Sequence, residues 1–170
     1  MAAGPSLCPL YANNTEAIRT RVETLREKLH TAPVSVFDHS SQTFGVVDYS
    51  LFSVQLLRTL YNPFTQGPIT AEGIVELEKG NGSLIYQGSD IALIDTLDTC
   101  QFDASQPFAA GYVDVVAPVL CGDSLGKAKR TLEEARATYQ QLLNISTFGS
   151  VWYPLTEGPC TYVTTGLALI

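Results

Sequence analysis

Helical spacing of the apolar residues is the feature that most constrains how this chain can fold. In residues 14–30, four apolar side chains recur at intervals of four, three and four, which places them on one helix face: Ile18, Val22, Leu25 and Leu29. Residues 50–61 are apolar around most of the helix circumference, so this second helix should be largely buried. These two patterns predict a fold built mainly from helices.

Capping and stop residues extend the prediction along the chain. Asn13, with Glu16 three residues later, is a capping pair for the first helix. A third helix is expected over 70–79, where a threonine can cap its start and Gly80 ends it. A capping box of the form Thr-x-x-Glu opens the last helix, which is expected over 131–144.

Strand-like patterns are few and short. The runs 34–37 and 43–47 are rich in β-branched and aromatic residues, and the short link between them predicts a hairpin. Residues 84–97 form either a helix or a strand, because their periodicity does not decide. The expected fold class is therefore mostly α with a small β-hairpin. Helices joined by long loops are typical of a cap or lid that packs on something larger.

Composition excludes several classes of partner. The chain has 170 residues, 45% of them hydrophobic and 16% charged, with a formal net charge of −7. This is a globular composition, and a disordered chain would show the opposite balance. No basic stripe extends beyond Lys127-Ala-Lys129-Arg130, so we expect no nucleic-acid partner. No apolar stretch reaches the roughly 18 residues that a bilayer span needs, so we expect no membrane partner.

Glycosylation sequons and cysteines point to secretion of a parent protein. The chain has three glycosylation sequons, which begin at Asn13, Asn81 and Asn144. Its four cysteines permit two disulfides, and none of them forms a C-x-x-C pair that would suggest zinc. The first residues lack the basic and apolar regions of a signal peptide. We therefore expect Met1 to be an internal methionine of a longer, extracellular parent.

Residues Gly122-Asp-Ser-Leu-Gly126 match the G-x-S-x-G pattern of a serine-hydrolase nucleophile elbow, with Ser124 as the nucleophile. The two histidines, His30 and His39, both precede it, which departs from the usual Ser…Asp…His order. His39 lies beside Asp38 and is the candidate base if the elbow is catalytic. We favour the alternative that Gly-Asp-Ser forms a turn, where Asp and Ser side chains bond to local backbone.

Other polar and aromatic residues have structural explanations. His30 lies at the C-terminal end of the first helix, where the helix dipole favours a cation. The acidic spread lacks the spacing of a calcium loop, so we expect a solvated face and no metal site: Asp90, Asp95, Asp98 and Asp103. Four aromatic residues are expected in the core rather than in a substrate wall: Tyr49, Phe52, Tyr61 and Phe64.

Several segments, taken in order, resemble the tripeptidyl-aminopeptidase-like (TAP-like) serine α/β-hydrolases. The resemblance covers roughly residues 2–160 and depends on the order and spacing of its motifs. The matching segments are Ala2-Ala-Gly-Pro-Ser-Leu-Cys8-Pro-Leu, Tyr61-Asn-Pro-Phe-Thr-Gln66, Leu77-Glu-Lys-Gly-Asn81, Val119-Leu-Cys-Gly-Asp123, Leu132-Glu-Glu-Ala-Arg136, Phe148-Gly-Ser-Val-Trp152 and Cys160.

The resemblance implies the helical lid of an α/β-hydrolase that cleaves peptides from the N-terminus, or small esters, with a Ser-Asp-His triad. In this family the serine precedes the lid and the acid and histidine follow it, so none of the three maps onto this chain. The resemblance also implies a disulfide between Cys121 and Cys160, whereas Cys8 would pair with an upstream cysteine. It divides the chain into one lid-like domain over 1–160 and a divergent tail over 161–170.

The resemblance further implies candidates for substrate binding. An aminopeptidase must hold the α-amino group of its substrate, and a lid carboxylate can do this. The candidates are Glu72, Glu76, Asp90 and Asp95. No cofactor is expected. The expected partner is the hydrolase core, as a missing segment or a partner chain, or else a second copy through self-association, and a small hydrophobic or peptide ligand is possible.

Three functions follow from these observations. The first is a lid segment of a secreted hydrolase that is not catalytic as this chain alone. The second is an independent, lid-derived protein that binds a hydrophobic small molecule or templates a non-hydrolytic reaction. The third is a compact serine esterase that uses Ser124 with His39. The sequence leaves open whether the chain is itself an enzyme.

Overall fold

The computed structural model describes residues 4, 8–38, 43–89, 119–121 and 131–162. The backbone divides into two compact units, Met1–Gln101 and Phe102–Ile170. Of the described residues, 72% are helical, and a two-stranded antiparallel sheet accompanies the helices. This confirms the expected class, mostly α with a small β-hairpin. The expected single domain over 1–160 and tail over 161–170 stay predictions.

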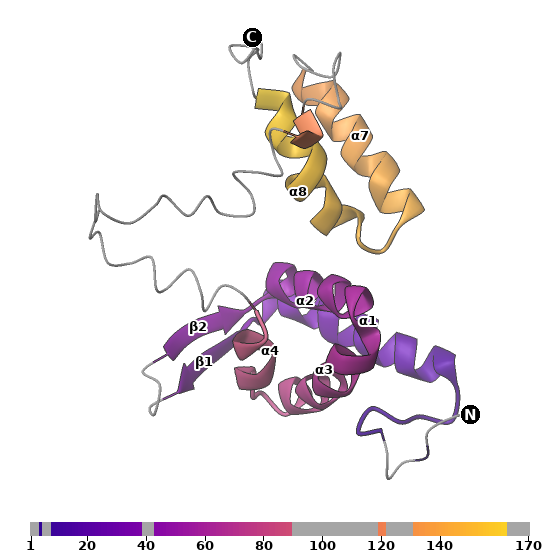
Figure 1. Cartoon of the computed structure of the whole chain (residues 1–170), viewed down its shortest axis with the longest axis vertical. Helices are drawn as coiled ribbons and strands as arrows, with labels where there is room; N and C mark the ends of the chain where they lie inside the picture. The colour runs from indigo at the N-terminus through magenta and orange to yellow at the C-terminus, as the bar shows by residue number, and fades with distance from the viewer. Residues whose placement is uncertain (1–3, 5–7, 39–42, 90–118, 122–130, 163–170) are drawn as a thin grey trace. The chain divides into compact units, whose positions relative to one another are not determined.

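In its described residues, the first unit contains four helices and one hairpin, which lies at one side of the helices next to the short helix α4 (Ser83–Gln87) (Figure 1). Helix α1 (Thr15–Thr31) packs on α2 (Tyr49–Tyr61), and α2 packs on α3 (Pro63–Glu78). Strands β1 (Val34–Asp38) and β2 (Thr43–Val47) pair with each other, and α4 contacts both strands and α3. The predicted hairpin is therefore confirmed, and residues 84–87 of the undecided stretch are helical.

The hairpin is apolar on both faces. Its register pairs Val34 with Val47 and Phe37 with Phe44. Because side chains alternate between the faces of a strand, Val36 and Val47 are buried, whereas Phe37 and Phe44 are exposed. The hydroxyl of Tyr86 in α4 donates to the Phe44 carbonyl over 3.1 Å and holds the helix against the strand.

Gly45 allows this contact between α4 and β2. A Cβ atom at position 45 would lie 2.2 Å from the ring of Tyr86, which is closer than any real contact. The absence of a side chain at Gly45 thus makes room for the tyrosine ring. A residue other than glycine would force α4 away from the strand.

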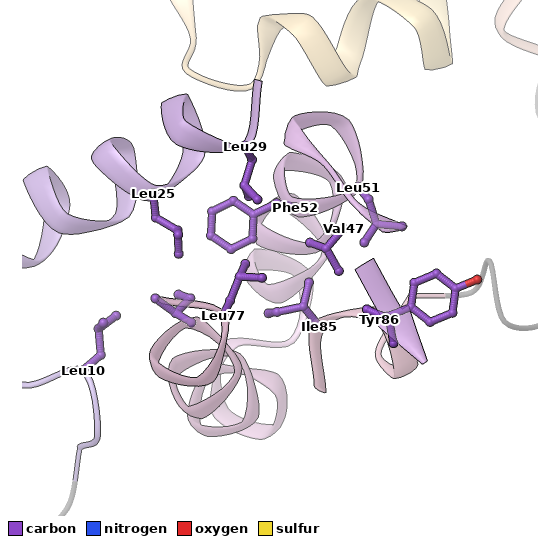
Figure 2. Close-up of a cluster of buried hydrophobic side chains, with 11 residues drawn as sticks. Leu10, Leu25, Leu29, Val47, Leu51, Phe52, Leu77, Ile85 and Tyr86 are labelled. Carbon is purple, nitrogen blue, oxygen red and sulfur yellow. The ribbon is translucent and has the colours of Figure 1, made fainter. Parts of the chain in front are cut away.

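Phe52 is the centre of the hydrophobic core. Its side chain is fully buried, at 0% exposure. Figure 2 shows its ring between Leu25 and Leu29 of α1 and Leu77 of α3. One α2 side chain therefore joins the apolar faces of three helices, and the α1 stripe predicted from sequence supplies two of its neighbours.

Two helix starts differ from the sequence prediction. The cap of α1 is Asn14 rather than Asn13, because the Asn14 side chain accepts the Ala17 N–H over 2.7 Å. Helix α3 begins at Pro63, seven residues before the predicted start at Thr70. Proline is well suited to the first helical turn, since the missing N–H would have no partner there. Thr70 is instead a buried residue inside α3, with its hydroxyl 2.8 Å from that of Thr59.

The predicted stop at Gly80 is confirmed. Gly80 has a φ of 89°, in the left-handed region that favours glycine. Its N–H donates to the Leu77 carbonyl over 3.0 Å, and the Asn81 N–H donates to the Glu76 carbonyl over 2.9 Å. These two bonds form a Schellman motif, which satisfies carbonyls that the end of α3 would otherwise leave without partners.

The second unit contains a pair of helices that lie side by side (Figure 1). Helix α7 (Leu132–Ile145) opens with the predicted capping box, in which the Thr131 hydroxyl accepts the Glu134 N–H over 3.2 Å. Helix α8 (Gly149–Tyr162) packs on α7. Gly149 lies so close to the end of α7 that a Cβ atom there would be 2.5 Å from the Leu142 carbonyl.

Two of the aromatic residues expected in the core are exposed. The prediction holds for Phe52, which is fully buried, whereas Tyr61 is 73% exposed and Phe64 is 94% exposed. Both lie where α2 ends and α3 begins, so neither faces the helices that bury Phe52. The expectation of a largely buried second helix is likewise wrong for its last turn, because Leu60 is also exposed.

Two phenylalanine substitutions test where the core lies. We expect Phe52→Ala to lower the free energy of unfolding by about 3–5 kcal/mol, because it leaves a cavity between three helices. The matched change Phe64→Ala removes the same atoms from an exposed site and should alter it by less than about 0.5 kcal/mol. Urea denaturation followed by circular dichroism measures both. Similar losses from the two variants would contradict this core.

Candidate functional site

The structure describes some of the sequence-predicted site residues and not others. Ser124 and His39, the candidate nucleophile and base, lie outside the described residues, as do Asp90 and Asp95. Glu72 is exposed on α3. The structure therefore leaves the catalytic interpretation of the G-x-S-x-G untested.

Of the two described substrate-binding candidates, Glu76 is the one that forms an ion pair with a lysine. It lies on α3 one turn after Glu72, is partly buried, and its Oε1 is 2.7 Å from Nζ of Lys79. A carboxylate with a lysine partner has less negative potential for a substrate ammonium than an unpaired one. The proposed role of these acids in holding an α-amino group stays a prediction.

Arg26 is the centre of a buried polar cluster between α1 and α2. Its side chain is only 5% exposed. The Nε atom donates to the Ser53 hydroxyl over 2.9 Å, and Nη2 donates to the Tyr49 hydroxyl over 2.6 Å. Nη1 donates to Glu23 over 3.3 Å, and Glu23 carries the balancing charge. Burial of a guanidinium costs free energy because the charge loses its hydration. These hydrogen bonds and the Glu23 carboxylate compensate for that loss.

Aromatic stacking extends the Arg26 cluster toward the end of α1. The guanidinium carbon of Arg26 lies 4.7 Å from the centre of the Tyr49 ring. His30 stacks on the same ring at 3.7 Å, and its Nε2 is 4.0 Å from Glu27. His30 thus packs on a tyrosine as well as lying at the helix end, and the sequence indicates only the second of these.

The Arg26 cluster connects helices and does not contain a nucleophile with a base. Arginine keeps its proton at physiological pH, so Arg26 donates to Ser53 and cannot accept its proton. Ser53 is also fully buried, which closes it to substrate. The sequence offers one weak signal for this cluster, since Arg26 lies four residues after Val22, beside the apolar stripe of α1.

A second ion pair connects α1 to α3. Arg21 donates through Nε and Nη2 to the two carboxylate oxygens of Glu78. This forked contact raises the pKa of Arg21 above its ordinary value, because the hydrogen bonds and the negative charge of Glu78 favour the charged form. Together with the Arg26 cluster, it places α1 by polar contacts on two neighbouring helices.

A groove of about 280 Å³ lies between α7 and α8. Its lining is mainly apolar and aromatic and carries one cation: Leu132, Ala135, Arg136, Tyr139, Tyr153 and Gly158. The rings of Tyr139 and Tyr153 meet edge to face, with their centres 5.5 Å apart. The volume is near the lower end for ligand pockets, so the groove would suit a small apolar molecule.

A second pocket, of about 300 Å³, lies at the start of α2. It is lined by Val46, Asp48, Ser50, Leu51, Val54, Arg58 and Ser89. Asp48 is already engaged there, because its Oδ1 accepts the Leu51 N–H over 2.8 Å and caps α2. This pocket therefore offers fewer uncommitted polar groups than its lining suggests.

A disulfide joins Cys121 to Cys160, with 5.0 Å between the Cα atoms. It connects a short helical turn at residues 119–121 to α8, and Cys160 is buried. This is the pairing that the TAP-like resemblance implies. Cys8 is a free, partly buried thiol that packs against the core of the first unit.

Four exposed apolar side chains lie close together in sequence around the point where α2 ends and α3 begins. Within ten residues, four large side chains are each at least half exposed: Leu60, Tyr61, Phe64 and Ile69. We refer to these four residues as the 60–69 corner. Where exposed apolar residues form a contiguous patch, that patch is typical of a surface that binds another molecule.

Helices able to cross a membrane are not found in the described part of the chain. The same residues contain no group of three or more acidic, histidine or cysteine side chains arranged to bind a metal ion. Comparisons of the chain with protein-family models, with curated proteins and with solved structures find no match. Any function must therefore be argued from the residues and contacts described above.

Arg26→Lys tests whether the buried cluster depends on a forked guanidinium. We expect it to lower the free energy of unfolding by about 2–4 kcal/mol, since a lysine cannot donate to Ser53 and Tyr49 together in this geometry. Arg19→Lys, at an exposed position on the same helix, should change it by less than about 0.5 kcal/mol. Chemical denaturation provides the measurement, and equal effects of the two variants would contradict the proposed connection.

Proposed function

We propose that this chain is a helical lid segment of a secreted TAP-like serine α/β-hydrolase and is not catalytic by itself. The parent reaction would be hydrolysis of N-terminal peptide bonds or small esters. The observation that carries this proposal is the disulfide between Cys121 and Cys160, because the family resemblance implies that pair among the chain's four cysteines.

The 60–69 corner supports the proposal. A lid presents apolar surface to the hydrolase core that it covers. In a lid without its core, this surface is exposed to solvent. Phe64 is almost fully exposed although it lies in the first turn of a helix whose other face is well packed. We therefore assign the 60–69 corner to contact with the hydrolase core.

In such an assembly, the lid and the core would supply different parts of the chemistry. The core would hold the serine, acid and histidine. The lid would close over the substrate, exclude water and bind the part of the substrate that does not react. Of the described candidates, Glu72 is exposed on α3 and could attract an α-amino group, whereas Glu76 is half-buried and would first have to leave Lys79.

The flanking coding sequence tests the lid proposal most directly. We expect a G-x-S-x-G motif upstream of Met1 in the same frame and an Asp…His pair downstream of Ile170. A fluorophosphonate probe should leave this chain alone unlabelled. An in-frame stop codon immediately before Met1 would contradict the proposal, and labelling that disappears in Ser124→Ala would favour the compact esterase instead.

Self-association of the chain tests the 60–69 corner. Light scattering should show a mass above that of one 18.4 kDa chain at high concentration, since the corner then has another copy to contact. Replacing Tyr61 and Phe64 together by serine should weaken association by roughly tenfold. Ile145→Ser, an exposed position in the second unit, is the control. A clean monomer at high concentration would argue against this surface.

The groove between α7 and α8 favours a second candidate function, an independent protein that binds a small hydrophobic molecule. Two tyrosine rings and the absence of a side chain at Gly158 leave apolar space beside Arg136. An aromatic carboxylate would fill such a groove and pair with the guanidinium.

Binding of 4-phenylbutyrate distinguishes this second candidate. We expect a saturable rise in melting temperature, because a ligand that binds the folded state stabilises it by mass action. Gly158→Leu should abolish the rise by filling the groove. Ala137→Leu adds the same side chain at an exposed position of α7 and should leave it unchanged. Binding that survives in Gly158→Leu, or no saturable rise, would exclude the groove as the site.

A further inference from the structure

The three sequons of this chain are not equivalent in the structure. All three asparagines are exposed, so exposure alone does not rank Asn13, Asn81 and Asn144. N-glycosylation requires the side-chain nitrogen of asparagine and the hydroxyl two residues later to be presented together. The local backbone of each sequon therefore decides how much conformational entropy the acceptor segment must lose before it can react.

Asn81 already has the required bend. Its Oδ1 accepts the N–H of Ser83, the hydroxyl residue of the same sequon, over 3.1 Å. This contact is an Asx-turn, which folds the asparagine side chain back over the two following residues. Because the oxygen faces the backbone, the nitrogen of this exposed amide is left for the solvent and for a bulky substituent.

Neighbouring contacts hold the Asx-turn in place. The N–H of Asn81 completes the Schellman motif at the end of α3, and Gly80 supplies the left-handed conformation that the motif needs. On the other side, a Cβ atom at Gly82 would lie 2.8 Å from Val47 and 2.9 Å from Val36, so the turn packs directly on the hairpin. The bend at Asn81 is thus anchored at both ends.

Asn144 has the opposite arrangement. It lies in the last turn of α7, and the N–H of Ser146 donates to the Leu142 carbonyl over 2.9 Å. The hydroxyl of Ser146 also accepts the Phe148 N–H over 3.1 Å. The groups that an Asx-turn and a glycosyl acceptor need are therefore engaged in ending the helix.

Asn13 is intermediate between the other two. It precedes the cap of α1, and Asn14 rather than Asn13 makes the capping hydrogen bond. In an Asx-turn, the asparagine side chain accepts the N–H of the residue two positions later. Within the described part of the chain, this bond is found at Asn81 and not at Asn13 or Asn144.

We propose that Asn81 is the preferred N-glycan acceptor of this chain and that Asn144 is the poorest. In the reaction, Nδ2 of Asn81 forms a bond to C1 of the sugar on a lipid diphosphate donor. The bond from C1 to the diphosphate oxygen breaks, the lipid diphosphate leaves, and Nδ2 loses one proton to the transferase. The inference depends on the proposed function in one respect, entry of the chain into the secretory pathway.

Site occupancy in a eukaryotic secretion host tests this inference. The full chain is expressed behind a secretion signal, its glycans are released enzymatically in heavy-oxygen water, and each sequon peptide is measured by mass spectrometry. We expect occupancy at Asn81 to be at least about twofold that at Asn144, because a preformed bend reduces the ordering cost. Asn81→Gln should remove the largest share of glycan, and Asn13→Gln and Asn144→Gln should remove less.

Gly80→Val tests the physical reason. It keeps the sequon but strains the left-handed position that holds the turn, so occupancy at Asn81 should fall toward that at Asn144 in the same molecules. Equal occupancy at Asn81 and Asn144 in the parent chain would overturn the inference, and so would unchanged occupancy in Gly80→Val. A chain without any glycan would also overturn it, whereas the lid proposal is decided separately by the flanking coding sequence.

Discussion

Burial of Phe52 is the interaction on which the first unit depends. Its ring lies among the apolar stripe of α1 and the inner face of α3, and it is the largest fully buried side chain among the described residues. Isolated helices of this length are marginal in water, so packing against a shared centre supplies most of their stability. The hairpin and α4 then complete the core through Val47 and Ile85. One α2 residue therefore lies at the centre of a core whose other members come from elements far apart in sequence.

Local sequence patterns predicted the elements in which those patterns match the surrounding structure. The α1 stripe, the α7 capping box and the hairpin all follow from local pattern, and the structure has each of them. The start of α3 and all of α8 could not be predicted in this way. Pro68 lies inside α3, and α8 contains two prolines and Gly158, residues that argue against a helix on propensity alone. Packing on α7 and the disulfide at Cys160 outweigh that propensity.

The site was less accessible from sequence than the fold. A charged residue beside an apolar stripe gives no sign of its partners, so the contacts of Arg26 with Ser53 and Tyr49 depend on a helix 23 or more residues away. The aromatic residues show the same limit, because Phe52 and Phe64 have the same side chain and opposite environments. Phe52 is buried because α1 and α3 pack around it, and the local sequence pattern around each phenylalanine does not show that packing.

The distribution of polar contacts indicates what the first unit is suited to do. Arg21 pairs with Glu78, Arg26 binds two hydroxyls and Glu23, and Glu76 pairs with Lys79. Each of these groups stabilises a helix or a helix contact, and a group that is held in this way has little capacity left to bind substrate. The large side chains that do remain exposed at the 60–69 corner are apolar. A surface of that kind contributes binding affinity mainly through desolvation of its apolar side chains.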